Sequence, residues 1–204
     1  MENSEEQWIQ AAVKGDKEAF SQLVEDYHTR VFSVCYRMLG TPTAAEDAAQ
    51  EAFIRAYRAI DRYDPQRSFA TWLLSITSNY CIDQLRKRKM NFLSMDNEKY
   101  AWLAPPAEGP NPEQMTLEKE KQALIQRMLS SLKETDRAAV ILQYWHDYSY
   151  QEIADTLDLS LSAVKSRLYR ARQHLAEEWQ EAQQAPSPLM DQRSERIPYE
   201  SPTF

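Results

Sequence analysis

Apolar residues recur every three or four positions over most of the chain, the spacing that places them on one face of an α-helix. The pattern is clear in four stretches between residues 4 and 89, and it returns between residues 113 and 181. No segment alternates apolar and polar residues as a strand does, and the chain contains only three glycines. We therefore predict an all-α fold.

Residues that favour helix ends divide the first half of the chain into four predicted helices. The last of them starts near Phe69 and ends in the basic run at 86–89. Two further helices are expected near 113–131 and 135–146. The predicted N-caps are Ser4, Asp16 and Thr43, the first and third in capping boxes with Gln7 and Glu46, and the predicted stops are Gly15, Gly40 and Pro42.

The helical pattern disappears between residues 93 and 112, where prolines are concentrated. Such a segment suits a linker that is semi-rigid where it is rich in proline. We predict one helical domain over 4–92 and a second over 113–181. Residues 182–204 are rich in proline and polar side chains, which predicts a disordered tail. The expected organisation is two small helical domains joined by a proline-rich linker, the second ending in a helix-turn-helix.

Residues 149–172, SYQEIADTLDLSLSAVKSRLYRAR, predict this helix-turn-helix. Ser149 and Glu152 fit a capping box that opens a first helix, and Asp158 suits the left-handed backbone of a turn. Ser160 is the predicted N-cap of the second helix. The predicted buried stripe of the second helix is Leu161, Val164 and Leu168.

The remaining face of this second helix is polar and basic and carries no acid. Such a helix fits a major groove, where basic groups neutralise phosphates and exposed side chains reach base edges. The alternative is an ordinary surface helix hairpin with a solvated basic face. The residues of the face are Ser162, Lys165, Ser166, Arg167, Tyr169, Arg170 and Arg172.

Charge is unevenly distributed along the chain. The net charge of −7 argues against a nucleic-acid-binding protein, yet basic residues are clustered at 86–89 and 165–172. The acids are concentrated in residues 1–51, in 113–136 and after residue 176. This distribution predicts weak DNA binding by the protein alone, and stronger binding when a partner presents it or hides the acids.

The composition, 43% hydrophobic and 27% charged, is that of a globular protein. No apolar run reaches the length of a membrane span, and the acidic start MENSEEQWIQ is unlike a signal peptide. Cys35 and Cys81 lie in helical apolar patterns, which predicts reduced core residues rather than a disulfide. We therefore expect a cytoplasmic protein.

The sequence does not predict an enzyme, a cofactor or a metal site. It contains no glycine-rich loop that could hold a phosphate, and its two cysteines lack the spacing of a zinc site. The three histidines, His28, His146 and His174, are far apart in the sequence.

Three segments occur in a specific order: RVFSVCYRMLGTPTAAEDAAQEAFIRAYRAI, FATWLLSITSNYCIDQLRKRK and YSYQEIADTLDLSLSAVKSRLYRAR. Together they resemble a bacterial RNA polymerase sigma factor of the extracytoplasmic-function type, which is group 4 of the sigma-70 family. With their connecting helices they cover nearly all of residues 8–178. The segment between the two domains is too short for the middle domain of housekeeping sigma factors. The resemblance implies an alternative sigma factor that directs promoter-specific transcription initiation.

Core RNA polymerase and promoter DNA are the partners that the resemblance implies. The polymerase contacts would be the clamp helices of the largest subunit and the flap, and an anti-sigma factor is a further candidate partner. In the family, the helix after a Gly-x-x-x-x-Ala-Glu-Asp segment docks on the clamp helices. Without the resemblance, its acids would be interpreted as a solvated helix N-terminus. The matching residues are Glu46, Asp47, Gln50 and Glu51, with Phe53 and Tyr57 beneath them.

The predicted helix from Phe69 resembles the family helix that opens the duplex and reads the minus-ten element. Asn79 matches the position that contacts a flipped base, and loop 61–67 matches the wall of its pocket. Phe69 and Trp72 are interpreted as core residues rather than base-stacking ones. Without the resemblance, the basic run would be a solvated helix end. Asp83, Arg86, Arg88 and Lys89 match the end that follows the DNA backbone.

The helix-turn-helix resembles the part of the family that reads the minus-thirty-five element in the major groove. Lys165, Ser166 and Tyr169 match the base-reading positions. One departure is that Ser162 and Ala163 stand where a Gly-Thr pair is common, which puts one phosphate contact in doubt. Arg167, Arg170 and Arg172 resemble phosphate contacts or packing residues.

A stand-alone helix-turn-helix regulator is the competing interpretation. Such a protein would bind duplex DNA as a dimer and without polymerase. It would leave the N-terminal helices unexplained.

Overall fold

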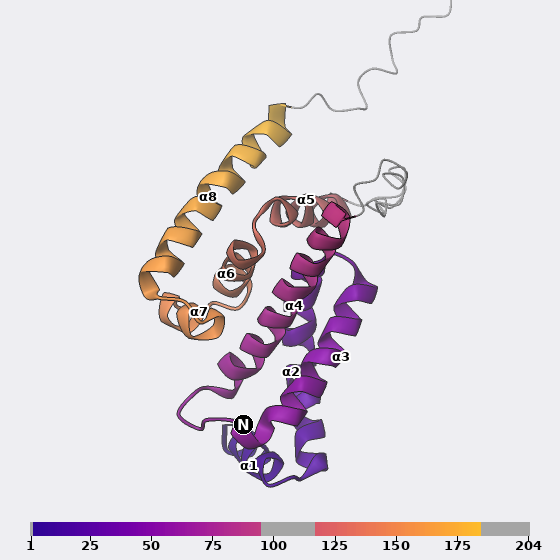
Figure 1. The fold of residues 1–204 in the computed structure, drawn as a ribbon, viewed down its shortest axis with the longest axis vertical. Helices are drawn as coiled ribbons and strands as arrows, with labels where there is room; N and C mark the ends of the chain where they lie inside the picture. Colours follow the sequence, from indigo (N-terminus) through magenta and orange to yellow (C-terminus); the bar gives the residue numbers. More distant parts are fainter. Residues whose placement is uncertain (1, 95–116, 185–204) are drawn as a thin grey trace, which may run out of the picture.

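The computed structural model of the protein describes residues 2–94 and 117–184, which form helices with short connections (Figure 1). No strand occurs in these two ranges, which confirms the predicted all-α class. Most of the predicted linker and tail lies outside the described residues. The helices are α1 (Glu2–Val13), α2 (Lys17–Leu39), α3 (Pro42–Ala59), the 3-10 turn η1 (Ile60–Arg62), α4 (Phe69–Ser94), α5 (Leu117–Ser131), α6 (Glu134–Trp145), α7 (Tyr150–Leu157) and α8 (Leu161–Gln184).

Both predicted ends of α2 are confirmed. The Asp16 carboxylate accepts hydrogen bonds from the backbone amides of Glu18 and Ala19, at 2.9 and 3.2 Å. These are two of the amides that a helix start otherwise leaves without a partner. At the other end, Gly40 has a left-handed backbone with φ of 89°, and its amide bonds the Tyr36 carbonyl.

The start of α3 differs from the prediction. Thr41, not Thr43, is the N-cap: its Oγ1 accepts from the Ala44 amide at 3.3 Å. Pro42 occupies the first helical position. An N–H at this position has no partner within the helix, so the proline costs no hydrogen bond. The predicted capping box of Thr43 with Glu46 is therefore wrong, because Thr43 lies inside the helix.

Three helices extend beyond their predicted ends. α1 begins at Glu2, ahead of the predicted cap Ser4. α4 continues past Lys89 to Ser94, so residues 93 and 94 belong to a helix and not to the linker. α8 continues past residue 181 to Gln184. No glycine or proline follows closely after Lys89 or residue 181 to stop these helices.

α2 is the central helix of the first half, and it packs against α1, α3 and α4. Its fully buried side chains are Leu23, Val31, Val34, Cys35 and Met38. The buried face of α3 is almost entirely alanine, which allows the two helices to approach closely. The alanines are Ala45, Ala48, Ala49, Ala52 and Ala56.

The two cysteines meet in this core. Cys35 on α2 and Cys81 on α4 are free and buried, with their sulfur atoms 3.8 Å apart. The hydrogen bond with Cys81 and burial raise the pKa of the Cys35 thiol. The prediction of reduced core residues is confirmed, and the thiols help to hold α2 against α4.

The two halves of the molecule pack against each other. α4 contacts α7 and α6, and α2 contacts α6 and α5, so that the buried residues form one continuous core (Figure 1). The sequence predicted two domains and gave no indication that they would be in contact. This arrangement brings the helix-turn-helix beside the predicted minus-ten helix.

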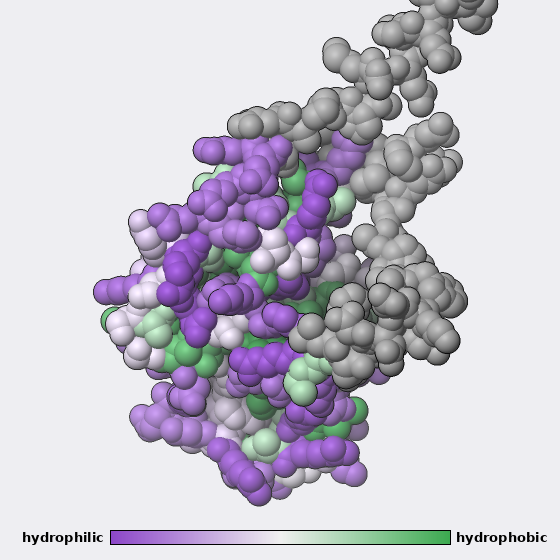
Figure 2. Space-filling view, turned by 45° about the horizontal axis from the view of Figure 1, so that its top comes forward, coloured by the Kyte–Doolittle hydropathy of each residue, from purple (hydrophilic) through white to green (hydrophobic). Residues whose placement is uncertain are grey.

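On the face shown in Figure 2, hydrophilic residues cover most of the described surface, with apolar residues in small patches between them. Among the described helices, none has the length and apolar character needed to cross a membrane.

Candidate nucleic-acid interface

The first helix of the helix-turn-helix, α7, starts with the predicted capping box. The Ser149 hydroxyl accepts from the Glu152 amide at 3.2 Å, and the Glu152 carboxylate accepts from the Ser149 amide at 2.7 Å. Hydrogen bonding of the Glu152 carboxylate to the Ser149 hydroxyl and to the Ser149 amide lowers the pKa of Glu152. Ile153, Ala154 and Leu157 are buried as predicted. Asp158 takes the left-handed conformation at φ of 52° and turns the chain toward α8.

α8 is also capped as predicted, because the Ser160 hydroxyl accepts from the Ala163 amide at 3.2 Å. Its buried stripe differs by one residue. Val164 and Leu168 are buried, but Leu161 is 40% exposed. Ala171 is buried one turn beyond Leu168, so the stripe lies one turn further along the helix than predicted.

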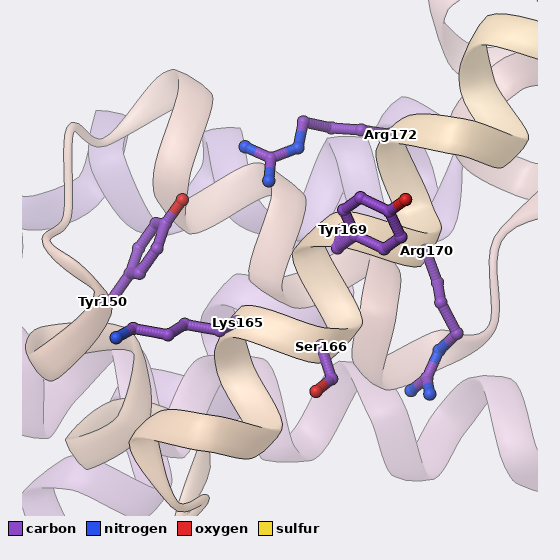
Figure 3. Close-up of a pocket in the computed structure, with 6 residues that line it drawn as sticks. All are labelled: Tyr150, Lys165, Ser166, Tyr169, Arg170 and Arg172. Atoms are coloured by element: carbon purple, nitrogen blue, oxygen red, sulfur yellow. The ribbon is translucent and has the colours of Figure 1, made fainter.

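The outward face of α8 forms a hollow of about 520 Å³ (Figure 3). Tyr169 is 57% exposed, and its hydroxyl accepts from the Gln173 side chain at 2.9 Å. An exposed aromatic ring among basic groups offers both apolar contact to a base and hydrogen bonding. The structure therefore brings together five predicted residues and one further residue. They are Lys165, Ser166, Tyr169, Arg170 and Arg172, with Tyr150 of α7.

Two tyrosines that the sequence did not predict lie near the guanidinium of Arg172. The hydroxyls of Tyr150 on α7 and Tyr144 on α6 lie near its guanidinium and raise the pKa of Arg172. Figure 3 shows Arg172 reaching from α8 toward the Tyr150 hydroxyl. The periodicity of one helix cannot reveal this cluster, because its members come from three helices. The one feature of the sequence that pointed to this cluster was Tyr150, which directly follows the N-cap Ser149.

Arg167 does not belong to the open basic face. Its guanidinium donates to the Asp136 carboxylate at 2.7 Å, and the two side chains are 29% and 11% exposed. Asp136 lies in the first turn of α6, so the pair joins α8 to α6. Of the two predicted roles for Arg167, phosphate contact or packing, the structure supports packing. Ser162 remains exposed at the start of α8, with its hydroxyl 3.1 Å from that of Ser160.

The predicted minus-ten residues lie along the exposed side of α4. Asn79, Asp83 and Arg86 follow each other at helical spacing, and all three are exposed. Arg86 lies 4.0 Å from Asp83. Arg88 and Lys89 are exposed in the same helix, one turn further on.

Aromatic residues brace the start of α4. Phe69 is 3% exposed, and Trp72 packs on it with ring centroids 5.4 Å apart. Tyr63 from the loop contacts both rings at 5.6 and 5.3 Å, and its hydroxyl donates to the Arg67 carbonyl. Phe69 is a core residue as predicted, whereas Trp72 is partly buried and packs against the core. Tyr63 fixes loop 61–67 to α4.

The predicted polymerase-binding residues lie on the first turns of α3. Asp47 and Gln50 are exposed, whereas Glu46 and Glu51 are half-buried. Gln50 donates to Glu46 at 3.4 Å, and His28 of α2 lies 3.8 Å from the same carboxylate.

Arg55 links this surface to α4. It donates to Glu51 at 2.8 Å, and its guanidinium lies 4.6 Å from the centroid of the Tyr80 ring. Phe53 is buried beneath the surface as predicted. Tyr57 was also expected beneath it but is 39% exposed, resting edge-on against Phe20 at 5.0 Å.

Among the described residues, no group of three histidine, cysteine, aspartate or glutamate side chains could hold a metal ion.

Two family profiles match the chain in the order of its two halves. Sigma-70 region 2 matches residues 23–90, and Sigma-70 region 4 matches residues 122–175. The first match contains α3 and most of α4, and the second contains the helix-turn-helix.

Curated relatives match over most of their own length. The ECF RNA polymerase sigma factor SigW of Bacillus subtilis (strain 168) is 37% identical over 175 residues, which are 82% of this chain and 92% of the relative. The ECF RNA polymerase sigma-E factor of Escherichia coli (strain K12) is 34% identical over 170 residues, covering 81% and 88% of the two chains.

Solved structures share the fold. One is CnrH in complex with the cytosolic domain of CnrY, with a TM-score of 0.63, 24% identity, and coverage of 87% of this chain and 98% of that one. Another is the sigma factor RpoE in complex with the anti-sigma factor NepR from Bartonella quintana, with a TM-score of 0.62, 22% identity, and coverage of 79% and 96%. The ordered pair of family matches and the full-length relatives together show that this chain belongs to the extracytoplasmic-function sigma factors of the sigma-70 family and is an alternative sigma factor for RNA polymerase.

Proposed function

We propose that α8 reads a minus-thirty-five element and α4 a minus-ten element, while α3 docks on core polymerase. The observation that carries this proposal is the outward face of α8. There Lys165, Ser166 and Tyr169 line one hollow on a capped, well-packed helix-turn-helix. Rigid placement of these side chains supports base reading, because a bidentate or apolar base contact requires a fixed geometry.

Arg170 and Arg172 would bind phosphates on either side of the bases. Arg172 is suited to this task because its guanidinium is exposed, with the hydroxyls of Tyr144 and Tyr150 nearby. Phosphate contacts fix the register of a protein on the duplex but are insensitive to base sequence. Arg167 is left out of this set, because Asp136 already occupies its guanidinium.

On α4, Asn79 would hold a base extruded from the duplex. Its amide is exposed on a helix whose start is held by packed aromatic rings, so its position is well defined. Arg86, Arg88 and Lys89 would follow the backbone of the opened strand, and basic grooves of this kind bind single strands. Asp83 lies within this set, with its carboxylate 4.0 Å from the Arg86 guanidinium.

On α3, the carboxylates and amide of Glu46, Asp47, Gln50 and Glu51 would bind the clamp helices of the largest polymerase subunit. Carboxylates form their strongest hydrogen bonds with arginine, which makes a basic partner helix the fitting counterpart. The second half of the protein would contact the flap. Of two proteins of similar fold, one has been solved with an anti-sigma factor and the other with the cytosolic domain of CnrY, which makes an anti-sigma factor a candidate partner for this chain as well.

Run-off transcription on a promoter library tests the proposal. Core polymerase with the protein should start at discrete two-part promoters, and core polymerase alone should not. Equal, promoter-independent transcription in both reactions would contradict it. A gel-shift with and without core polymerase distinguishes the competing regulator, which would bind promoter DNA tightly without polymerase.

A further inference from the structure

A cation–π contact joins α3 to α4 beside the residue proposed to hold a base. The Arg55 guanidinium of α3 lies 4.6 Å from the centroid of the Tyr80 ring of α4. Tyr80 is half-buried, and burial together with the nearby Glu51 carboxylate raises its pKa, so the phenol stays neutral. The face of such a ring is electron-rich and attracts a guanidinium. We call this contact the Arg55–Tyr80 stack.

Tyr80 directly follows Asn79 on α4. Successive residues of a helix are turned by about 100° about its axis, so Tyr80 faces Arg55 on α3 while Asn79 is exposed. Ser78 and Cys81, which flank the two residues, are buried in the core. A rotation of α4 that moved Asn79 sideways would therefore pull the Tyr80 ring away from Arg55.

The same guanidinium belongs to the surface proposed to bind polymerase. Arg55 Nε donates to the Glu51 carboxylate at 2.8 Å, one turn earlier on α3. The two side chains are 47% and 34% exposed, so water screens the pair and its contribution to folding is small. A basic group of a partner that approached Glu51 would nevertheless meet the positive charge of Arg55 directly beside it.

We propose that Arg55 and Tyr80 are positioning residues for strand opening, and that the charge of Arg55 at the same time weakens polymerase docking on Glu51. This inference rests on the proposed roles of Asn79 and Glu51. The stack resists rotation of the turn of α4 that carries Asn79, and a binding residue has to be held within about 0.5 Å of its productive position. The guanidinium also neutralises part of the Glu51 charge that a basic partner helix would bind.

Arg55→Gln separates the two effects. The glutamine amide can still donate to Glu51, but the positive charge and the cation–π contact are lost. The rate of strand opening by polymerase saturated with the protein should fall about 2- to 5-fold, which corresponds to an exposed cation–π contact. The affinity for core polymerase should instead rise about 2- to 5-fold at low salt, and this gain should shrink as salt is added.

Both quantities are measured with the full-length protein. Stopped-flow fluorescence of 2-aminopurine in the minus-ten element of a promoter selected by run-off transcription gives the opening rate. Fluorescence anisotropy of the labelled protein gives the affinity for core polymerase. A variant that had lost its fold would show a loss in both measurements, so a fall in both for Arg55→Gln would overturn the inference.

Arg58→Gln is the matched control, because it makes the same change of charge at an exposed position three residues later on α3. It should leave the opening rate unchanged and raise the polymerase affinity less than Arg55→Gln does. Tyr80→Leu removes the ring and should slow opening without changing that affinity, whereas Tyr80→Phe keeps the ring and should restore the opening rate.

A double variant tests whether Arg55 and Tyr80 act through one contact. Arg55→Gln combined with Tyr80→Leu should open the promoter no more slowly than the slower single variant, because both changes break the same stack. Opening rates whose reductions multiply in the double variant would overturn the inference. An equal slowing by Arg58→Gln would do the same.

The roles on which the inference rests are measured in the same assays. If Asn79→Ala opened the promoter at the wild-type rate, or Glu51→Gln bound core polymerase as tightly as the wild type, the proposed function would fail and the inference with it. If both variants showed their losses while Arg55→Gln behaved like Arg58→Gln, the proposed function would stand and only the inference would fail.

Discussion

At the scale of single residues, the α8 surface separates side chains that would read bases from those that would bind phosphate. Tyr169→Ala and Lys165→Ala should change the preference at particular positions of the minus-thirty-five element, by about 1–3 kcal/mol where a good base contact is lost. Arg170→Ala should weaken binding to all promoters alike. A promoter library with randomised upstream elements measures both effects. Identical sequence profiles for all three variants would contradict the assignment.

Arg167 and Asp136 should behave as a structural pair. Arg167→Ala leaves the nearly buried Asp136 carboxylate without its partner and should lower the free energy of unfolding by about 1–3 kcal/mol. The double variant with Asp136→Ala should recover part of this loss, because no unpaired charge remains. Denaturant unfolding of the two single variants and the double variant measures the coupling. Additive losses would show that the pair contributes nothing beyond its separate side chains.

His146 should make stability depend on pH. Burial, and the positive charges of Arg30 and Arg37, lower its pKa to about 4. An unfolded histidine has a pKa near 6.5, so the native state favours the neutral ring. The free energy of unfolding is therefore at its full value above pH 6.5. It decreases as the pH falls toward 4, because the unfolded chain then binds a proton that the folded chain does not.

NMR titration of the His146 ring protons measures the pKa directly, and a value near 6.5 would contradict the prediction. His146→Asn should show a smaller loss of stability than the wild-type protein between pH 6.5 and 4. The comparison is needed because carboxylates also begin to titrate near the lower end of this range.

At the scale of helices, α4 begins in a cluster of packed aromatic rings and carries Asn79 on an exposed face further along. Asn79→Ala should leave the closed promoter complex nearly intact and slow the opening of the strands, because the amide would no longer hold the extruded base. A template with a pre-opened bubble should rescue transcription. If the bubble gives no rescue while the variant unfolds at lower denaturant concentration, Asn79 has a structural role instead.

The helices themselves were largely predictable from the sequence, because their signals are local. Asp16, Gly40, Ser149 and Ser160 cap or end helices as predicted, through bonds to amides or carbonyls a few residues away. Thr43 was misassigned because Thr41-Pro42 and Thr43 offer competing starts, and proline at the first position decided between them.

The candidate site was predictable where one helix supplies it and not where several do. The periodicity of α8 placed Lys165, Ser166 and Tyr169 on one open face. It also placed Arg167 there, since nothing in the local sequence shows that Asp136 comes within 2.7 Å. The positions of Tyr144 and Tyr150 near Arg172 were not predicted for the same reason, because contacts between distant segments leave no periodic signal in one sequence.

At the scale of the whole molecule, the contact between the two halves is the main feature that the sequence did not predict. A segment without helical periodicity, such as 93–112, indicates only that one group of helices ends before it in the sequence and another begins after it. Whether they also touch depends on surface residues such as Gln126 and Arg37. Their polar character is equally compatible with exposure to water.

The turn at Gly40 has a consequence for how far this position can vary. Its backbone, at φ of 89°, favours glycine, and asparagine is one of the few other residues that tolerate such a conformation. A methyl group there would come to 3.4 Å from the Gln126 amide nitrogen, so any longer side chain would compete for its space. Asparagine would therefore keep the turn between α2 and α3 while displacing Gln126. A relative that carries asparagine here would retain its fold and lose the contact of the Gln126 side chain of α5 with the end of α2.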